Sequence, residues 1–205
     1  MPYCLVVASN NPDKFREIQE KLSPLPLALQ SLADFLFVQK VIEDQPDLLG
    51  NAVKKVTAIA QATGLWALAD DTGLEVDALY GAPGVLSARY SGPGATYQSN
   101  CDKLLHDMAA VPDGQRQARF RCVLCLKTDD GLFCVEGKVE GCIGRAPRGS
   151  GGFGYDPIFV LSSGRTLAEL SLAEKNTISH RAQALDKMAA LLRWLLSQDG
   201  NSCKA

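Results

Sequence analysis

A short apolar run, Trp66–Ala69, stops at two adjacent carboxylates, Asp70 and Asp71, which are followed by Thr72 and Gly73. Open α/β sheets build their sites where strands deliver polar groups at their carboxyl ends, so the run predicts a buried strand that ends at a functional site. Adjacent residues on an extended chain point to opposite faces, and Asp70 and Asp71 are therefore expected to have different roles. A carboxylate at the rim of a sheet is a suitable ligand for Mg2+. The alternative is a strand that simply ends in a turn capped by Asp.

The segments around this run alternate between strand-like and helix-like patterns. Residues 4–8 are apolar and β-prone, and the turn signal Asp129-Asp130-Gly131 separates two further strand-like runs, 117–126 and 132–139. Helix-like spacing or capping is found over residues 15–22, 48–62, 96–108 and 180–195. This order predicts an α/β protein, and its 205 residues are enough to bury a sizeable core.

Composition excludes several classes of protein. The net charge of -2 argues against a bulk nucleic-acid binder, and no apolar run approaches the roughly 20 residues of a membrane span. Residues 1–8 contain no Lys or Arg and read as a first strand, not as a signal peptide. The 7 scattered cysteines fit a reducing cytoplasm better than a disulfide framework. Cys122 and Cys125 lie on a predicted strand and are expected to pack in the core, not to bind zinc.

A polar loop, Ser9–Lys14, connects the first predicted strand to a helix. Asn11 is a suitable N-cap, Pro12 suits the first turn and Asp13 suits the positive end of the helix dipole. Such a helix N-terminus presents backbone N–H groups to phosphate, and Lys14 could add a full charge. The segment is not a Walker loop, and the alternative is an ordinary capped turn.

Two later segments also combine unusual residues. Phe153–Pro157 places glycine between aromatic rings, which would let a planar ligand approach closely; a β-bulge with core aromatics is the alternative. Ser179 is a suitable N-cap for the last helix, but His180 and Arg181 put cations where the helix dipole favours acids. Such a local conflict is typical of residues that serve a site.

Five motifs thus follow one another along the chain: Ser9-Asn10-Asn11-Pro12-Asp13-Lys14; Ala69-Asp70-Asp71-Thr72-Gly73-Leu74; Gly81-Ala82-Pro83-Gly84 with Ser87-Ala88-Arg89-Tyr90-Ser91-Gly92; Gly152-Phe153-Gly154-Tyr155-Asp156-Pro157; and Glu174-Lys175 with Ser179-His180-Arg181. Each motif alone is weak, but the ordered set is specific. Together they resemble the inosine triphosphate pyrophosphatase family, the non-canonical purine nucleoside triphosphate pyrophosphatases. The resemblance extends from residue 5 to about residue 195.

The resemblance implies an α/β fold of the ITPase-like, Maf/Ham1-like kind. This is an elongated mixed β-sheet with flanking helices, in two lobes around a central nucleotide cleft. A single nucleotide pyrophosphatase domain would span residues 1–198, and residues 199–205 would form a frayed tail. The family is usually homodimeric and cytoplasmic, and no membrane or nucleic-acid partner is expected.

The reaction implied is Mg2+-dependent hydrolysis of ITP, dITP or XTP to the monophosphate and pyrophosphate, which cleans the nucleotide pool. By position, Asp71 would be catalytic, and Glu43 and Asp71 would hold Mg2+. The expected substrate-binding residues are Ser9, Asn10, Asn11, Pro12, Asp13, Lys14, Lys55, Thr72, Phe153, Gly154, Tyr155, Asp156, Lys175, His180 and Arg181. Hydrogen-bond donors on His180 and Arg181 would bind the 6-oxo group of a purine and disfavour the 6-amino group of adenine.

One segment departs from the family pattern. The family's Thr-Phe-x-Glu-Asn-Ala-like run is replaced by Asp47–Ala52, which loosens the assignment of Glu43 and leaves Asp44 as the alternative ligand. Lys55 follows the Asn51-Ala52 pair as in the family, although a lysine on a helix is usually a solvated residue. The rival functions are a pyrophosphatase for modified pyrimidine nucleotides and a nucleotide-binding module without activity. A haloacid-dehalogenase-like phosphatase would need a DxDx[TV] motif, which Asp70-Asp71-Thr72 does not match.

Overall fold

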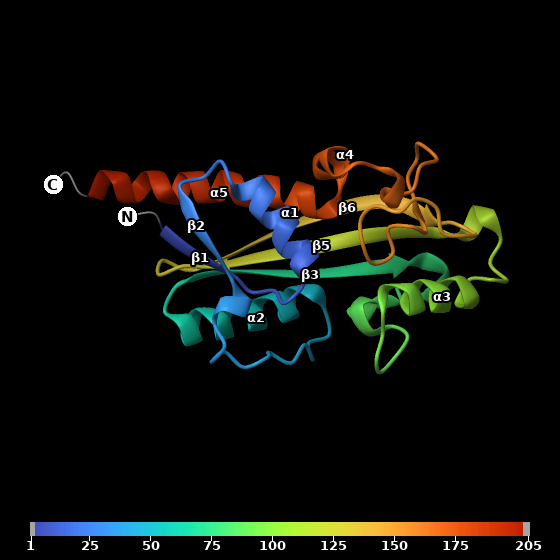
Figure 1. Ribbon diagram of the computed structural model, residues 1–205, viewed down its shortest axis with the longest axis horizontal. Helices are drawn as coiled ribbons and strands as arrows, with labels where there is room; N and C mark the ends of the chain where they lie inside the picture. The colour runs from blue at the N-terminus through green and yellow to red at the C-terminus, as the bar shows by residue number, and fades with distance from the viewer. Residues whose placement is uncertain (1–2, 203–205) are drawn as a thin grey trace.

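The computed structural model describes residues 3–202, and in this part of the chain helices flank one seven-stranded mixed sheet (Figure 1). The strand order is β2-β1-β3-β5-β6-β7, and β4 pairs with β3. The strands are β1 (Tyr3–Val7), β2 (Leu27–Ser31), β3 (Trp66–Val76), β4 (Pro83–Gly84), β5 (Gln117–Lys127), β6 (Leu132–Ile143) and β7 (Phe159–Val160). The α-helices are α1 (Pro12–Leu22), α2 (Leu48–Thr63), α3 (Tyr97–Asp107), α4 (Leu172–Ile178) and α5 (His180–Ser202). Short 3-10 helices cover Leu32–Asp34, Asp77–Leu79, Ser87–Arg89, Asp113–Gln115 and Leu167–Glu169.

Strand β3 does not end at its carboxylates. The sequence predicted that the strand would end there, either at a functional site or in a turn, and in both cases the predicted end of the strand is wrong. The strand continues to Val76 and pairs antiparallel with β5 from Ala67 onward. Asp70 and Asp71 remain inside a regular strand because cationic side chains from α1, α2 and α5 satisfy their carboxylates. These partners are not visible in the local sequence.

The other edge of β3 is open at its centre. Parallel β1 pairs with residues up to Leu68, and β4 begins to pair only at Leu74. Between them, residues 69–73 face no strand on this side in the described part of the chain. Side chains from both faces of β3 can therefore reach one cleft at this edge.

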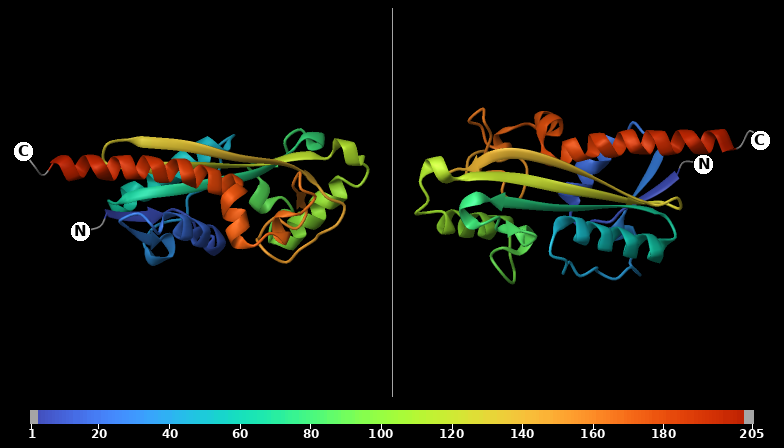
Figure 2. Two further views of the ribbon diagram at one scale, coloured as in Figure 1. Left: turned by 90° about the horizontal axis from the view of Figure 1, so that it is seen from above. Right: turned by 180° about the vertical axis from the view of Figure 1, so that it is seen from behind.

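The hydrophobic core is divided in the same region. On one face of the sheet, α1 and α5 cover a cluster that contains Leu68, whereas α3 and its neighbours cover a second cluster that contains Leu74. Asp70 and Thr72 lie between Leu68 and Leu74 on the same face of β3, because alternate residues of a strand share a face. Helix α2 covers Ala67 and Ala69 on the opposite face. The two predicted lobes are thus two hydrophobic clusters on a shared sheet, separated by polar residues, and Figure 2 shows α5 running along that sheet.

Most local predictions are confirmed. The helices over residues 48–62 and 96–108 and the hairpin across Asp129–Gly131 are present, with boundaries shifted by only a few residues in the helices. Gly64 ends α2 in the left-handed conformation, with φ of 68°. Helix α5 extends to Ser202, past the predicted start of a frayed tail at residue 199, and residues 203–205 lie outside the described part of the chain. No helix in residues 3–202 is long and apolar enough to cross a membrane.

The cysteines differ from the sequence expectation at one point. Cys125 and Cys134 are directly opposed on β5 and β6, and a disulfide joins them. The pairing was not predicted because the two residues share no short motif and meet only through the register of the hairpin. Cys122 is buried, as expected, and its thiol contacts the carboxylate of Asp70.

Candidate active site

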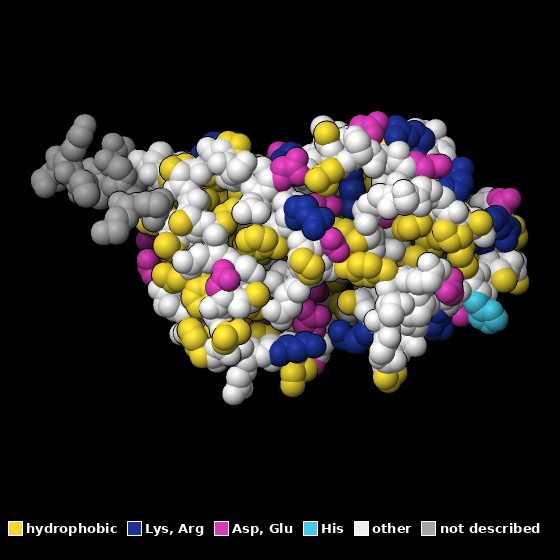
Figure 3. Space-filling model, viewed as in Figure 1, with side chains coloured by type: hydrophobic (Ala, Val, Ile, Leu, Met, Phe, Trp, Pro, Cys, Tyr) yellow, Lys and Arg dark blue, Asp and Glu magenta, His cyan; other side chains and the backbone are white. Residues whose placement is uncertain are grey.

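Two adjoining cavities lie at the open edge of β3. The first, which we call the carboxylate pocket, has a volume of about 220 Å³ and includes Glu43, Lys55, Asp70 and Asp71 in its lining. The second, the aromatic pocket, has a volume of about 100 Å³. Both pockets are bordered by the same four residues: Asn11, Lys14, Thr72 and Ala88. In Figure 3, acidic and basic side chains surround a hollow near the middle of the molecule.

The carboxylate pocket is centred on a buried lysine. Lys55 on α2 donates to Asp71 Oδ1 at 2.9 Å and to the backbone carbonyl of Asp70 at 2.8 Å, and its Nζ lies 2.9 Å from Glu43 Oε1. Burial disfavours its charge, but the two carboxylates outweigh this effect and raise the pKa of Lys55 above its ordinary value. Lys55 is therefore not the solvated lysine that its place on a helix would suggest. Its neighbour Lys54 is solvated, and it pairs with Asp44 on the surface.

The donor set of this pocket fits Mg2+. Glu43 and Asp71 present their oxygens to the same ammonium, so both carboxylates converge on one point. Proteins commonly hold Mg2+ through one or two carboxylates, with the remaining positions filled by water and substrate phosphate. No cluster of three or more His, Cys, Asp or Glu side chains that could hold a metal ion occurs in the described residues. Of the two candidates from sequence, Glu43 lines the pocket and Asp44 points to Lys54 outside it.

Asp70 faces the opposite way from Asp71 and has different partners, as the alternation predicts. Its carboxylate accepts hydrogen bonds from Lys14, from Thr72 Oγ1 at 2.8 Å and from Arg181 Nε at 2.7 Å. Burial opposes its ionisation, but the charges of Arg181 and Lys14 dominate and hold the pKa of Asp70 well below its ordinary value. Asp70 therefore stays charged and fixes two cations beside the cavity.

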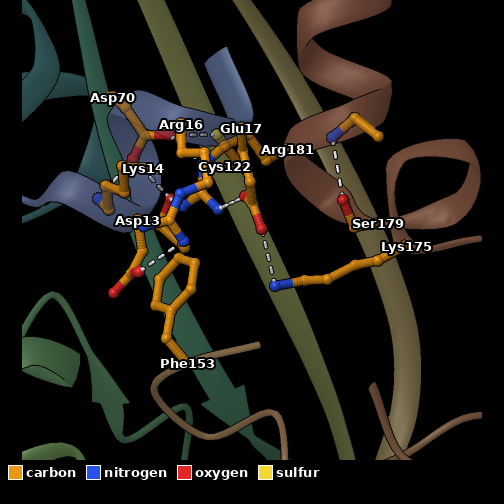
Figure 4. A network of polar contacts seen from close by, with 12 residues as sticks. Asp13, Lys14, Arg16, Glu17, Asp70, Cys122, Phe153, Lys175, Ser179 and Arg181 are labelled. Atoms are coloured by element: carbon orange, nitrogen blue, oxygen red, sulfur yellow. Dashed lines mark hydrogen bonds and ion pairs between the residues drawn. The ribbon is translucent and has the colours of Figure 1, made fainter. Parts of the chain in front are cut away.

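A second buried carboxylate, Glu17, extends this network into the aromatic pocket (Figure 4). Glu17 on α1 accepts from Arg181 Nη1 on α5, and its other oxygen lies 2.8 Å from Lys175 Nζ on α4. Lys175 also donates to Asp156 at 2.7 Å. Because burial of one partner alone would leave an uncompensated charge, the four residues act as one unit that joins three helices and a loop.

The loop at Phe153 forms the rest of the aromatic pocket. The Phe153 ring lies 4.6 Å from Lys175 Nζ and 5.5 Å from the Arg181 guanidinium carbon. Asp156 accepts from the backbone N–H of Phe153 and closes the turn. Gly152 is required here, since a Cβ would lie 2.1 Å from Asp156 Oδ2 and the residue has a positive φ of 68°. Tyr155 is buried and donates to the carbonyl of Ser87 at 2.9 Å.

His180 and Arg181 both border the aromatic pocket, as the sequence predicts, but Arg181 is less free than expected. Its guanidinium already donates to Asp70, Glu17 and Thr72. His180 stacks on Phe120 with ring centroids 4.6 Å apart, and its Nδ1 has no hydrogen-bond partner among the described residues. Burial and the charge of Arg181 hold the pKa of His180 well below its ordinary value, so the ring is neutral at pH 7.

The predicted phosphate loop is divided between the pockets and the surface. Asn11 caps α1 by accepting from the backbone N–H groups of Asp13 and Lys14, and Ser9, Asn10, Asn11 and Lys14 line the carboxylate pocket. Pro12 and Asp13 line neither pocket, which differs from the prediction. The Asp13 carboxylate contacts Arg16 and the hydroxyl of Tyr97.

Sequence reasoning missed several residues that complete the site. The sequence held one signal for Glu17, since its carboxylate lies next to Ile18 on the face of α1 that is buried. Arg89, which lies in a recognised motif without an assigned role, donates to the backbone carbonyl of Glu43 at 3.0 Å. Tyr97 lines the aromatic pocket but gave no sequence signal beyond its place at the start of a helix.

Comparison with known proteins identifies the family of this chain. The model of the Ham1 family matches residues 5–191. Proteins named dITP/XTP pyrophosphatase from Geobacter sulfurreducens and Escherichia coli (strain K12) are each 48% identical, with 93% and 92% of this chain and 96% and 98% of the relatives covered. The solved structure of a Ham1 protein from Coxiella burnetii has a TM-score of 0.86 at 42% identity and covers 93% of this chain and 98% of that one. The family model, which covers most of the chain, and the similarity to these relatives show that this chain belongs to the Ham1 family.

Proposed function

We propose that the protein is a Mg2+-dependent pyrophosphatase that hydrolyses ITP, dITP and XTP to the nucleoside monophosphate and pyrophosphate. The relatives with the name dITP/XTP pyrophosphatase support the activity and the substrate class. The observation that carries the proposal is the junction of two unlike pockets, one lined by carboxylates and lysines and one lined by aromatic rings and buried polar groups.

The two pockets suit the two ends of a nucleoside triphosphate. The purine would enter the aromatic pocket, where Phe153 offers a ring for stacking. The triphosphate would extend into the carboxylate pocket past Asn11 and Lys14, which border both spaces. The sugar would therefore lie at the junction of the pockets.

Cleavage of the α–β bond depends on charge neutralisation and positioning more than on covalent chemistry. Mg2+ held by Glu43 and Asp71 would offset phosphate charge when it is bound. Asp71 would orient the attacking water and take its proton. Lys14 and Lys55 would neutralise charge on the leaving pyrophosphate, and Lys55 also fixes the carboxylate of Asp71 through its 2.9 Å hydrogen bond.

Selectivity for the base would come from the polar groups of His180 and Arg181 that line the aromatic pocket. His180 and the remaining N–H groups of Arg181 could donate to the 6-oxo group of hypoxanthine or xanthine, whereas the 6-amino group of adenine would meet a donor. A site built on hydrogen bonds can reject such a mismatch by several orders of magnitude.

An end-point assay with ITP, XTP, GTP, ATP and dTTP tests the proposal, provided that pyrophosphate and orthophosphate are measured separately. We expect pyrophosphate from ITP and XTP far above the other substrates, and no product when EDTA removes Mg2+. Equal rates on all five nucleotides, or orthophosphate as the product, would contradict the proposal. A high rate on dTTP alone would favour the pyrimidine-directed alternative.

A further inference from the structure

Tyr97 connects the two sides of the site from a position that the proposed mechanism does not use. It is the first residue of α3, directly after the Thr96 N-cap, whose capping box fixes the start of the helix. From there its phenol oxygen reaches the loop before α1, where it accepts from Asn11 Nδ2 at 2.9 Å and lies 3.4 Å from Asp13 Oδ2. These contacts join segments more than 80 positions apart in the chain.

The ring of Tyr97 forms part of a wall. Its centroid lies 5.8 Å from that of Phe153, with the ring planes inclined by 38°. Both rings line the aromatic pocket, and both also line a hollow of about 260 Å³ on their other side. Tyr97 and Phe153 therefore form a partition that separates the base-sized cavity from the outer surface.

The hydroxyl of Tyr97 acts at the junction of the pockets. Asn11 borders both cavities, and its side-chain oxygen accepts from the backbone N–H groups of Asp13 and Lys14. The amide of Asn11 is thus held at both ends, by the start of α1 through its oxygen and by Tyr97 through its nitrogen. Tyr97 is the link between the wall of the aromatic pocket and the loop that leads to the carboxylate pocket.

We propose that Tyr97 is a further nucleotide-binding residue: its ring closes the outer side of the base pocket, and its hydroxyl holds Asn11 where the sugar passes. The inference rests on the proposed function, because it requires a purine nucleotide in these pockets. Tyr97 does not line the carboxylate pocket, so its contribution is to binding and not to bond cleavage.

Two substitutions separate the contribution of the Tyr97 ring to nucleotide binding from that of its hydroxyl. Tyr97→Phe keeps the ring and removes the bond to Asn11, which should raise the KM for ITP about 2- to 10-fold. Tyr97→Ala removes both and should raise it about 10- to 100-fold. In both variants kcat should stay within about twofold, because the groups around Asp71 are unchanged. Tyr80→Phe and Tyr80→Ala are matched controls, since Tyr80 is fully exposed and lines neither pocket.

Calorimetric titration with inosine monophosphate and with inorganic pyrophosphate tests the inference apart from turnover. We expect the Tyr97 variants to lose affinity for the monophosphate, in the order Ala more than Phe, and to bind pyrophosphate as the wild type does. Equal monophosphate affinity in wild type and Tyr97→Ala would overturn the role of Tyr97 and leave the proposed function intact. A wild-type protein that binds no nucleotide at all would overturn both. Equal losses for monophosphate and pyrophosphate would show a general structural effect and would also overturn the inference.

Discussion

At the scale of single residues, the two adjacent carboxylates of β3 have different partners because they point to opposite faces of the strand. Asp71 shares Lys55 with Glu43 in the carboxylate pocket, whereas Asp70 holds Lys14 and Arg181 on the other face. The sequence predicted this division, because alternation along a strand follows from backbone geometry alone. It did not predict the partners, because Arg181 lies 111 positions from Asp70 and reaches it only through tertiary packing.

Substitution of Asp70 should destabilise the fold. Asp70→Asn removes the buried negative charge that Arg181 and Lys14 share and leaves Arg181 paired with Glu17 alone, and breaking a buried pair in this way commonly costs about 3–5 kcal/mol. Urea unfolding should show this loss in the free energy of unfolding. The control is Asp186→Asn, which breaks the pair between exposed Asp186 and partly exposed Lys21 and should cost less than about 1 kcal/mol. Equal stability of the two variants would refute the structural role of Asp70.

At the scale of elements, the helices and the hairpin were predictable because their apolar periodicity, caps and turn residues are local. The length of β3 was not, since the sequence suggested that two carboxylates end a strand. A further feature that depends on the fold is the close approach of α5 to β6. A Cβ on Gly137 would lie 2.0 Å from the carbonyl oxygen of His180 and 2.5 Å from the backbone nitrogen of Ala184. This glycine lets the start of α5 rest directly on the sheet.

Replacing Gly137 should therefore disturb the site through the position of a helix. Gly137→Ala forces the first turn of α5 away from β6 and should cost about 1–3 kcal/mol of stability. Because His180 and Arg181 lie in that turn, the affinity for inosine monophosphate should fall as well. Both effects can be measured by thermal unfolding and by calorimetric titration.

Gly114→Ala is the matched control for this substitution. Nothing lies within 4 Å of its added Cβ. We expect its stability and its nucleotide affinity to equal those of the wild type. Wild-type affinity in a folded Gly137→Ala protein would show that the helix contact does not position the site.

At the scale of the whole molecule, the open edge of β3 brings two hydrophobic clusters and two pockets together around one cleft. The order of the sequence motifs predicted most of the residues in this cleft, because the fold brings the motif at the centre of β3 together with motifs in loops and at helix starts. Glu17, Arg89 and Tyr97 could not be assigned in the same way. Their roles come from contacts between segments far apart in the chain, which local patterns do not encode.

The kcat of Asp71→Asn for ITP most directly tests the assignment of bond cleavage to the carboxylate pocket. We expect kcat to fall about 100- to 1000-fold. The affinity for inosine monophosphate should stay within about threefold of wild type, because the base pocket is intact. Asp44→Asn, which removes a surface carboxylate paired with Lys54, should leave kcat unchanged. A folded Asp71→Asn protein with near-normal kcat would contradict the assignment.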